Sequence, residues 1–222
     1  MKTISKAIAI ASLATVATAA NAEVSVTGGV MSDYIFRGIS QSSGSGYAAV
    51  DYEESGFYAG VWGADVDNAL EVDLYLGYGI ELDSGVSISA GFTRYEYTSN
   101  RVNADLSQDE FNLNLGMAGF GIGYVLGSNN RDAGDQDYDV ITLTYDAENW
   151  GVLVGMVDND DQDNNPGSES EYNWAELSTS AEVAGLTVGA TVGVQFNAEA
   201  GGADTASNDG YITFDISKSF DL

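Results

Sequence analysis

Apolar and polar residues alternate one by one along several stretches of this chain, most regularly over Leu70–Asp83 (LEVDLYLGYGIELD). In that stretch apolar residues and one tyrosine hold the even positions, while mostly acidic residues and glycine hold the odd ones. Because successive side chains of a β-strand point to opposite faces, this period of two predicts a strand with one apolar and one polar face. Such strands restrict the fold to a sheet that separates two different environments.

The same alternation, less regular in places, divides the chain into twelve predicted strands. They lie at about 24–40, 47–54, 57–64, Leu70–Asp83, Val86–Thr98, Glu110–Met117, Phe120–Gly127, 138–146, 150–157, 172–184, Leu186–Phe196 and 210–222. Several exceed ten residues, whereas strands of soluble sandwiches usually have about 5–6 residues and membrane-spanning strands need about 9–11. The lengths favour an all-β, antiparallel transmembrane β-barrel over a soluble periplasmic β-sandwich.

Short and long connections alternate between the predicted strands. Tight connections are expected at Ser55-Gly56, Asp83–Gly85, Ala118-Gly119, Ala147–Asn149 and Ala184-Gly185. Long or polar connections are expected at 41–46, 65–69, 99–109, 128–137, 158–171 and 197–209, and the only proline, Pro166, falls in one of them. In outer-membrane barrels the short turns face the periplasm and the long loops face outside, so this order predicts both fold and orientation.

Residues 1–22 have the pattern of a secretion signal. Lys2 and Lys6 precede an alanine-rich run, and Ala20-Asn21-Ala22 forms a small-x-small cleavage site. We expect the mature barrel to span residues 23–222, as one domain in the outer membrane of a Gram-negative bacterium. No later stretch approaches the ~20 apolar residues that a transmembrane helix needs. The final strand ends on Leu222 and resembles the terminal strand that barrel-assembly machinery recognises.

Charge and composition exclude several classes of function. Cleavage after residue 22 would remove Lys2 and Lys6 and leave five basic against 34 acidic residues, a net charge of −29. So acidic a chain is not expected to bind nucleic acid through its phosphates, and its 44% hydrophobic content argues against disorder. The chain lacks histidine and cysteine, the usual base, nucleophile and zinc ligands. We expect no enzymatic activity, no cofactor and no structural metal.

Two segments near the start of the predicted mature chain resemble a known family. Residues 32–41 read SDYIFRGISQ, and residues 51–62 read DYEESGFYAGVW. An acidic strand follows over Glu71–Tyr78 (EVDLYLGY). Together they resemble the TorF-family porins, also known as Gcw_chp proteins, over residues 32–78. The resemblance implies an outer-membrane barrel that acts as a channel and says little about its solute.

One face of the predicted strands carries charged side chains that could line a pore. Asp33 and Arg37 lie four residues apart, and the neighbouring phase (Val24, Val26, Val30, Tyr34 and Phe36) looks lipid-facing. Asp33 and Arg37 are then lumenal, either as part of a constriction or as a structural ion-pair network. The predicted pore lining consists of Asp33, Arg37, Asp51, Glu53, Glu71, Asp73, Glu81, Glu110, Glu176 and Asp215. Its acidic excess predicts a preference for cations.

Glycine is frequent on the same lumen-facing side of the predicted strands, at Gly77, Gly79, Gly91, Gly116, Gly121, Gly123, Gly127, Gly155, Gly189 and Gly193. These glycines leave space for solute, or they provide curvature and room for lumenal tyrosines such as Tyr75 and Tyr95. The acidic loop at 158–171 departs from an EF-hand, because Pro166 takes the glycine position and Tyr172 that of the bidentate glutamate. Looser divalent-cation binding there, bridging to lipopolysaccharide phosphates, stays open.

These observations predict a narrow, passive outer-membrane channel for ions or small solutes. Its expected partners are outer-membrane lipid, lipopolysaccharide, the barrel-assembly machinery and the transported solute. The alternative is a filled, non-conducting barrel with a structural or adhesive role through its acidic surface loops. The sequence names neither the solute nor the oligomeric state.

Overall fold

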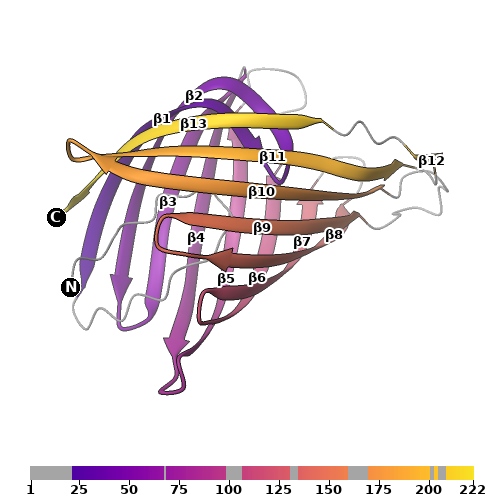
Figure 1. Ribbon diagram of the computed structural model, residues 1–222. Coiled ribbons are helices and arrows are strands. Elements are labelled where there is room, and N and C mark those ends of the chain that lie inside the picture. Colours follow the sequence, from indigo (N-terminus) through magenta and orange to yellow (C-terminus); the bar gives the residue numbers. More distant parts are fainter. Residues whose placement is uncertain are drawn as a thin grey trace.

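The computed structural model describes residues 22–67, 69–98, 107–130, 135–159, 170–200, 203–204 and 209–222. All regular structure in these ranges is β-strand (Figure 1). The strands are β1 (Glu23–Phe36), β2 (Ile39–Glu54), β3 (Phe57–Val66), β4 (Ala69–Glu81), β5 (Val86–Thr98), β6 (Ser107–Met117), β7 (Phe120–Asn130), β8 (Gln136–Asp146), β9 (Trp150–Asn159), β10 (Ser170–Val183), β11 (Leu186–Ala200), β12 (Ala203–Asp204) and β13 (Gly210–Asp221). Across these ranges no helix is long and apolar enough to cross a membrane.

The strands pair in one antiparallel ring. Each strand from β1 to β11 pairs with its successor, β11 also pairs with β13, and β13 pairs with β1. The two-residue β12 pairs only with the end of β11 and does not belong to the wall. The protein is therefore a closed, twelve-stranded antiparallel barrel, as the sequence predicts, and it leaves no open sheet edge in the ring. The Leu222 amide donates to the Val24 carbonyl oxygen over 2.9 Å, so the two ends of the described chain lie together.

Apolar side chains cover the outside of this barrel. Leu76, Phe92, Phe111 and Leu126 are paired in register on β4, β5, β6 and β7. Each is between 39% and 50% exposed, and they form one apolar row across four strands. A band of this kind is costly in water and favourable against lipid chains. The even-numbered phase of Leu70–Asp83 therefore faces outward, and the acidic phase faces the lumen.

Tight turns join the strands at the end where the described chain begins and ends. Ser55-Gly56, Ala118-Gly119 and Ala184-Gly185 each have two consecutive residues with positive φ, between 51° and 87°. This geometry belongs to two-residue hairpin turns whose twist matches that of the flanking strands. The turns predicted at Asp83–Gly85 and Ala147–Asn149 also fall between strands. All five predicted tight connections are confirmed.

Two connections at the opposite end are shorter than predicted. β1 ends at Phe36 and β2 begins at Ile39, so the turn is Arg37-Gly38 and residues 41–46 lie within β2. Arg37 and Gly38 have φ values of 50° and 80°, the same left-handed pair as in the other hairpins. Likewise β3 ends at Val66 and β4 begins at Ala69. The connection predicted at 41–46 was wrong, because Arg37-Gly38 closes the hairpin before the serine-rich segment begins. The connection predicted at 65–69 exists but is shorter than these bounds.

Candidate functional site in the barrel lumen

The tip of the β1–β2 hairpin lies inside the barrel. In the wall β1 and β2 neighbour only β13 and β3, yet Arg37 contacts residues of β6 and β8, and Gly38 lies against β10. Such contacts require the hairpin to cross the lumen. Figure 1 shows the ends of β1 and β2 bending over and turning back into the ring of strands. The lumen is therefore partly occupied by the chain's own hairpin.

An ion pair anchors the hairpin tip to the far wall. Arg37 Nη1 lies 2.7 Å from Glu110 Oε1, and Nη2 donates to Oε2 over 2.9 Å. The side chains are 12% and 0% exposed. The hydroxyls of Tyr95 and Tyr138 also donate to Glu110, over 3.0 and 2.6 Å. A bidentate, charge-assisted pair of this kind is among the stronger polar contacts in proteins.

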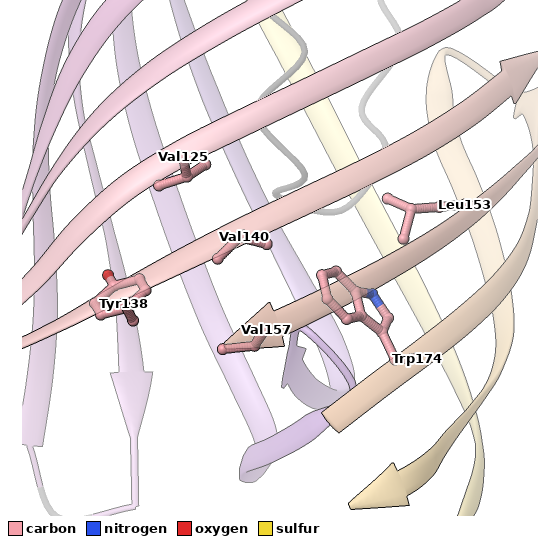
Figure 2. Packing of buried hydrophobic residues seen from close by; sticks show 6 residues of the cluster. All are labelled: Val125, Tyr138, Val140, Leu153, Val157 and Trp174. Atoms are coloured by element: carbon pink, nitrogen blue, oxygen red, sulfur yellow. The ribbon is translucent and has the colours of Figure 1, made fainter. Parts of the chain in front are cut away.

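Trp174 supports the same tip from β10. A Cβ atom added to Gly38 would lie 2.7 Å from the Trp174 Cβ, and one added to Gly155 would overlap the indole ring. The two glycines thus let the hairpin and β9 approach the tryptophan closely. Trp174 is 2% exposed and belongs to an inner apolar cluster with Val125, Tyr138, Val140, Leu153 and Val157. Figure 2 shows these side chains on neighbouring strands β7 to β10.

The structure corrects the predicted direction of Tyr34 and Phe36. Tyr34 is 2% exposed and stacks at a tilt on Trp62 with ring centroids 5.5 Å apart. Phe36 packs beside Tyr95 and under the Arg37 guanidinium. Both therefore point inward, whereas Val30 is 59% exposed on the outside. β1 pairs with β13 only as far as Met31, so Tyr34 and Phe36 lie on the part of the β1–β2 hairpin that leaves the wall and enters the lumen.

Two buried carboxylates lie on the inner face of β4. Glu71 and Asp73 are 1% and 3% exposed. The Tyr34 hydroxyl donates to Glu71 Oε1 over 2.9 Å. Trp62 and Tyr95 flank Asp73 in register on β3 and β5. Asp73 also interacts electrostatically with Glu71 and Glu110, so these three acidic side chains form one group, here called the carboxylate group.

Tyrosine rings lie over inner glycines elsewhere on the wall. Tyr75 covers Gly60 on β3 and donates to Asp51, while Tyr211 covers Gly193 on β11 and donates to Glu176 over 2.7 Å. Five of the predicted inner glycines are covered by aromatic side chains in this way: Gly77 and Gly91 by Tyr58, Gly127 by Tyr138, Gly155 by Trp174, and Gly193 by Tyr211. At these positions the glycines make room for rings, the second of the two interpretations of the glycine phase.

The other predicted pore residues are not part of the carboxylate group. Asp33 and Glu53 are half-buried on β1 and β2, and Glu81 is exposed at the end of β4. Asp215 of β13 lies over Gly189. Most of the segment 158–171 with its divalent-cation hypothesis, and nearly all of the signal segment 1–22, lie outside the described residues.

A second charged network, which the sequence did not indicate, lies on the outer face. Arg94 of β5 pairs with Glu96 and with Asp109 of β6, the latter at 3.1 Å. The Asn130 amide donates to the same aspartate over 3.0 Å. Arg94 is opposite Leu74, which is 50% exposed. The network therefore lies on the lipid-facing side near the ends of these strands, where an apolar band has to give way to polar surroundings.

A family model described as "Bacterial protein of unknown function (Gcw_chp)" matches residues 15–220. The chain belongs to the Gcw_chp family. The match covers every strand of the barrel wall except the last residue of β13. No curated protein has a sequence significantly similar to this Gcw_chp protein.

Solved structures resemble the Gcw_chp barrel in fold at low sequence identity. A chain from work on in-meso crystallization of membrane proteins has a TM-score of 0.59 at 8% identity, over 90% of this chain and 84% of that one. OprD from Pseudomonas aeruginosa gives 0.48 at 10% identity, over 90% and 65%. OccAB2 from Acinetobacter baumannii gives 0.49 at 9% identity, over 82% and 56%. The Gcw_chp chain thus spans little more than half the length of OccAB2.

Proposed function

We propose that this Gcw_chp protein is a narrow, passive channel of the bacterial outer membrane that carries ions or small solutes and prefers cations. The observation that carries the proposal is the closed barrel with an apolar outer band and a charged, acidic interior. A purely apolar interior would serve a structural barrel equally well, whereas buried charges in membrane proteins commonly mark ion or solute pathways. The resemblance of residues 32–78 to TorF-family porins supports the same proposal, and a catalytic role is not part of it.

The position of the tight turns supports an orientation. The turns at Ser55-Gly56, Ala118-Gly119 and Ala184-Gly185 lie at the same end as Glu23 and Leu222, which in outer-membrane barrels is the periplasmic end. The β1–β2 hairpin then enters the lumen from the outside. Its tip forms the constriction of the proposed channel. Lipid, lipopolysaccharide and the barrel-assembly machinery are the partners that this placement implies.

The charges around the constriction support cation preference. Glu71, Asp73 and Glu110 are buried together, and the nearby cation Arg37 is paired with Glu110. Because Arg37 neutralises only Glu110, the electrostatic potential around the hairpin tip is negative. A negative lumen with low-dielectric walls concentrates cations and repels anions. Arg37 is thus at the same time a member of the constriction and part of a structural ion pair.

Single-channel recording on purified, refolded protein in a planar bilayer tests this function. Under a KCl gradient, the reversal potential should have the sign of a K⁺-selective pore. The selectivity should weaken at high salt, because the Debye screening length becomes shorter. Heat-modifiable gel migration on the same sample verifies that the barrel is folded. An anion-selective potential would overturn the cation preference. Folded protein without conductance would favour the filled barrel with a structural or adhesive role.

A further inference from the structure

The carboxylate group contains more acid than its neighbours neutralise. Oε2 of Glu71 and Oδ1 of Asp73 are buried and have no hydrogen-bond partner among the described residues. Glu110, by contrast, has both oxygens engaged by Arg37 and two tyrosines. A buried carboxylate oxygen without a donor or a cation is energetically costly. Tyr97 of β5 stands in register beside Glu71 and interacts with it, but no described side chain donates a hydrogen bond to these two oxygens. A cation bound there would offset the cost of their burial.

The basic side chains of the described residues are engaged elsewhere. Arg37 is bound to Glu110, and Arg94 is bound to Glu96 and Asp109 on the outer face. Lys218 lies over the Phe220 ring on β13. None of them is placed to compensate Asp73, whose electrostatic neighbours are the carboxylates of Glu71 and Glu110. Within the described part of the chain, no basic side chain therefore neutralises Asp73.

The walls around the two oxygens also suit a cation. Glu71 and Asp73 are two residues apart on one face of β4, or roughly 6–7 Å along the strand. Trp62 and Tyr95 stand beside Asp73 on the adjoining strands, and Tyr34 reaches over Glu71. Aromatic faces attract cations that have lost part of their hydration shell. All these residues are almost fully buried, so an ion that reaches the two carboxylates has lost most of its water.

We propose that Glu71 and Asp73 form a binding site for a compact monovalent cation, of the size of K⁺ or ammonium, beside the constriction. Two free carboxylate oxygens between aromatic side chains do not replace the full set of oxygen ligands that Mg²⁺ or Ca²⁺ takes, which favours a monovalent ion over a divalent one. The site deepens the proposed cation preference and rests on the same lumen. Binding itself does not depend on conduction, so the two can be tested apart.

Thermal unfolding of the detergent-folded full chain tests the site. K⁺ replaces N-methyl-D-glucamine at constant ionic strength and constant chloride, and the unfolding midpoint is recorded. Because a ligand that binds only the folded state stabilises it, each tenfold rise in K⁺ above its Kd should raise the midpoint by about 3–5 °C. Ammonium should act in the same way, whereas tetramethylammonium should not.

The decisive comparison uses two double variants of equal charge. Glu71→Gln with Asp73→Asn should lose the K⁺-dependent rise, whatever its own starting midpoint. Asp83→Asn with Glu148→Gln removes two exposed acids from periplasmic turns and should keep the rise. If the first double variant does not fold, Glu71→Gln and Asp73→Asn are measured singly, and each should reduce the rise.

An equal K⁺ response in both double variants would overturn the site, because it would report general screening. A flat response of the wild-type midpoint would overturn it as well. Bilayer recording on the same samples separates the site from the channel. A K⁺-dependent midpoint without conductance would support the site and refute the channel. Cation-selective conductance with a midpoint that does not depend on K⁺ would support the channel and refute the site.

Discussion

Arg37 and Glu110 form a bidentate ion pair across the barrel lumen, with Nη1–Oε1 and Nη2–Oε2 distances of 2.7 and 2.9 Å. The two residues lie 73 positions apart in the sequence, on the β1–β2 turn and on β6. The pair fixes the inward-folded hairpin to the opposite wall. It is thus the contact on which the width of the proposed constriction depends.

Breaking this pair should loosen the hairpin and change both stability and conduction. Arg37→Ala leaves Glu110 buried without its cation and should lower the free energy of unfolding by about 3–5 kcal/mol. Conductance and cation preference should both increase, because the tip is released and a positive charge is removed. Chemical unfolding in detergent and bilayer recording measure these effects. Arg37→Met with Glu110→Leu should lose much less stability, and an equal loss in both variants would contradict a specific ion pair.

The close approach of Gly38 to Trp174 gives a second test. Gly38→Ala adds a Cβ at a φ of +80° and within 2.7 Å of the Trp174 Cβ. It should cost more stability than Gly185→Ala, where φ is +77° but nothing lies within 4 Å of the added atom. Backbone strain alone accounts for about 1–2 kcal/mol at either position, and steric overlap acts only at Gly38. Equal unfolding free energies for the two variants would show that the hairpin tip does not press on Trp174.

Selectivity should follow the unpaired acids of the lumen. Replacing Glu71 and Asp73 with Gln and Asn should shift the reversal potential under a KCl gradient towards zero, because the negative field near the constriction is weakened. Glu54→Gln serves as the control, since Glu54 is exposed next to the Ser55-Gly56 turn. The same shift in both variants would mean that surface charge, not the lumen, sets the selectivity.

Labelling of single cysteines should report the orientation. Cysteines at Ser84 and Asn149, which lie in tight turns, should not react with an impermeant maleimide added to intact cells. Cysteines at Gly134 and Ser168 should react; these two positions lie outside the described residues. The chain has no native cysteine, so each label reports one site. Reaction at Ser84 or Asn149 in intact cells would reverse the proposed orientation.

Cell fractionation should place the protein in the outer membrane. We expect a product that begins at Glu23, co-sediments with outer-membrane markers and migrates differently on gels before and after boiling. We expect the membrane location because the apolar outer band is unfavourable in water and favourable against lipid chains. N-terminal sequencing and gel migration provide the measurements. Recovery as a soluble periplasmic protein would contradict the membrane location.

The sequence by itself determined the class of fold and much of its wall. Alternation in Leu70–Asp83 reports which side chains face lipid, because the period of a strand is fixed by its backbone geometry. Pairs such as Ala118-Gly119 encode their turns locally, because both residues need positive φ. The buried phase of Glu71 and Asp73 follows from the same alternation. These features depend on neighbours in the chain, so a single sequence suffices to predict them.

Only the tertiary structure decided how the lumen is filled. The alternation around Tyr34 predicts an outward side chain, but β1 stops pairing with β13 at Met31 and its end turns into the lumen, which the local sequence pattern does not indicate. Arg37 meets Glu110, and Gly38 meets Trp174, only because the closed ring sets the distance between β1 and the opposite wall. Contacts across a barrel depend on strand number and tilt, which are properties of the whole sheet rather than of any segment.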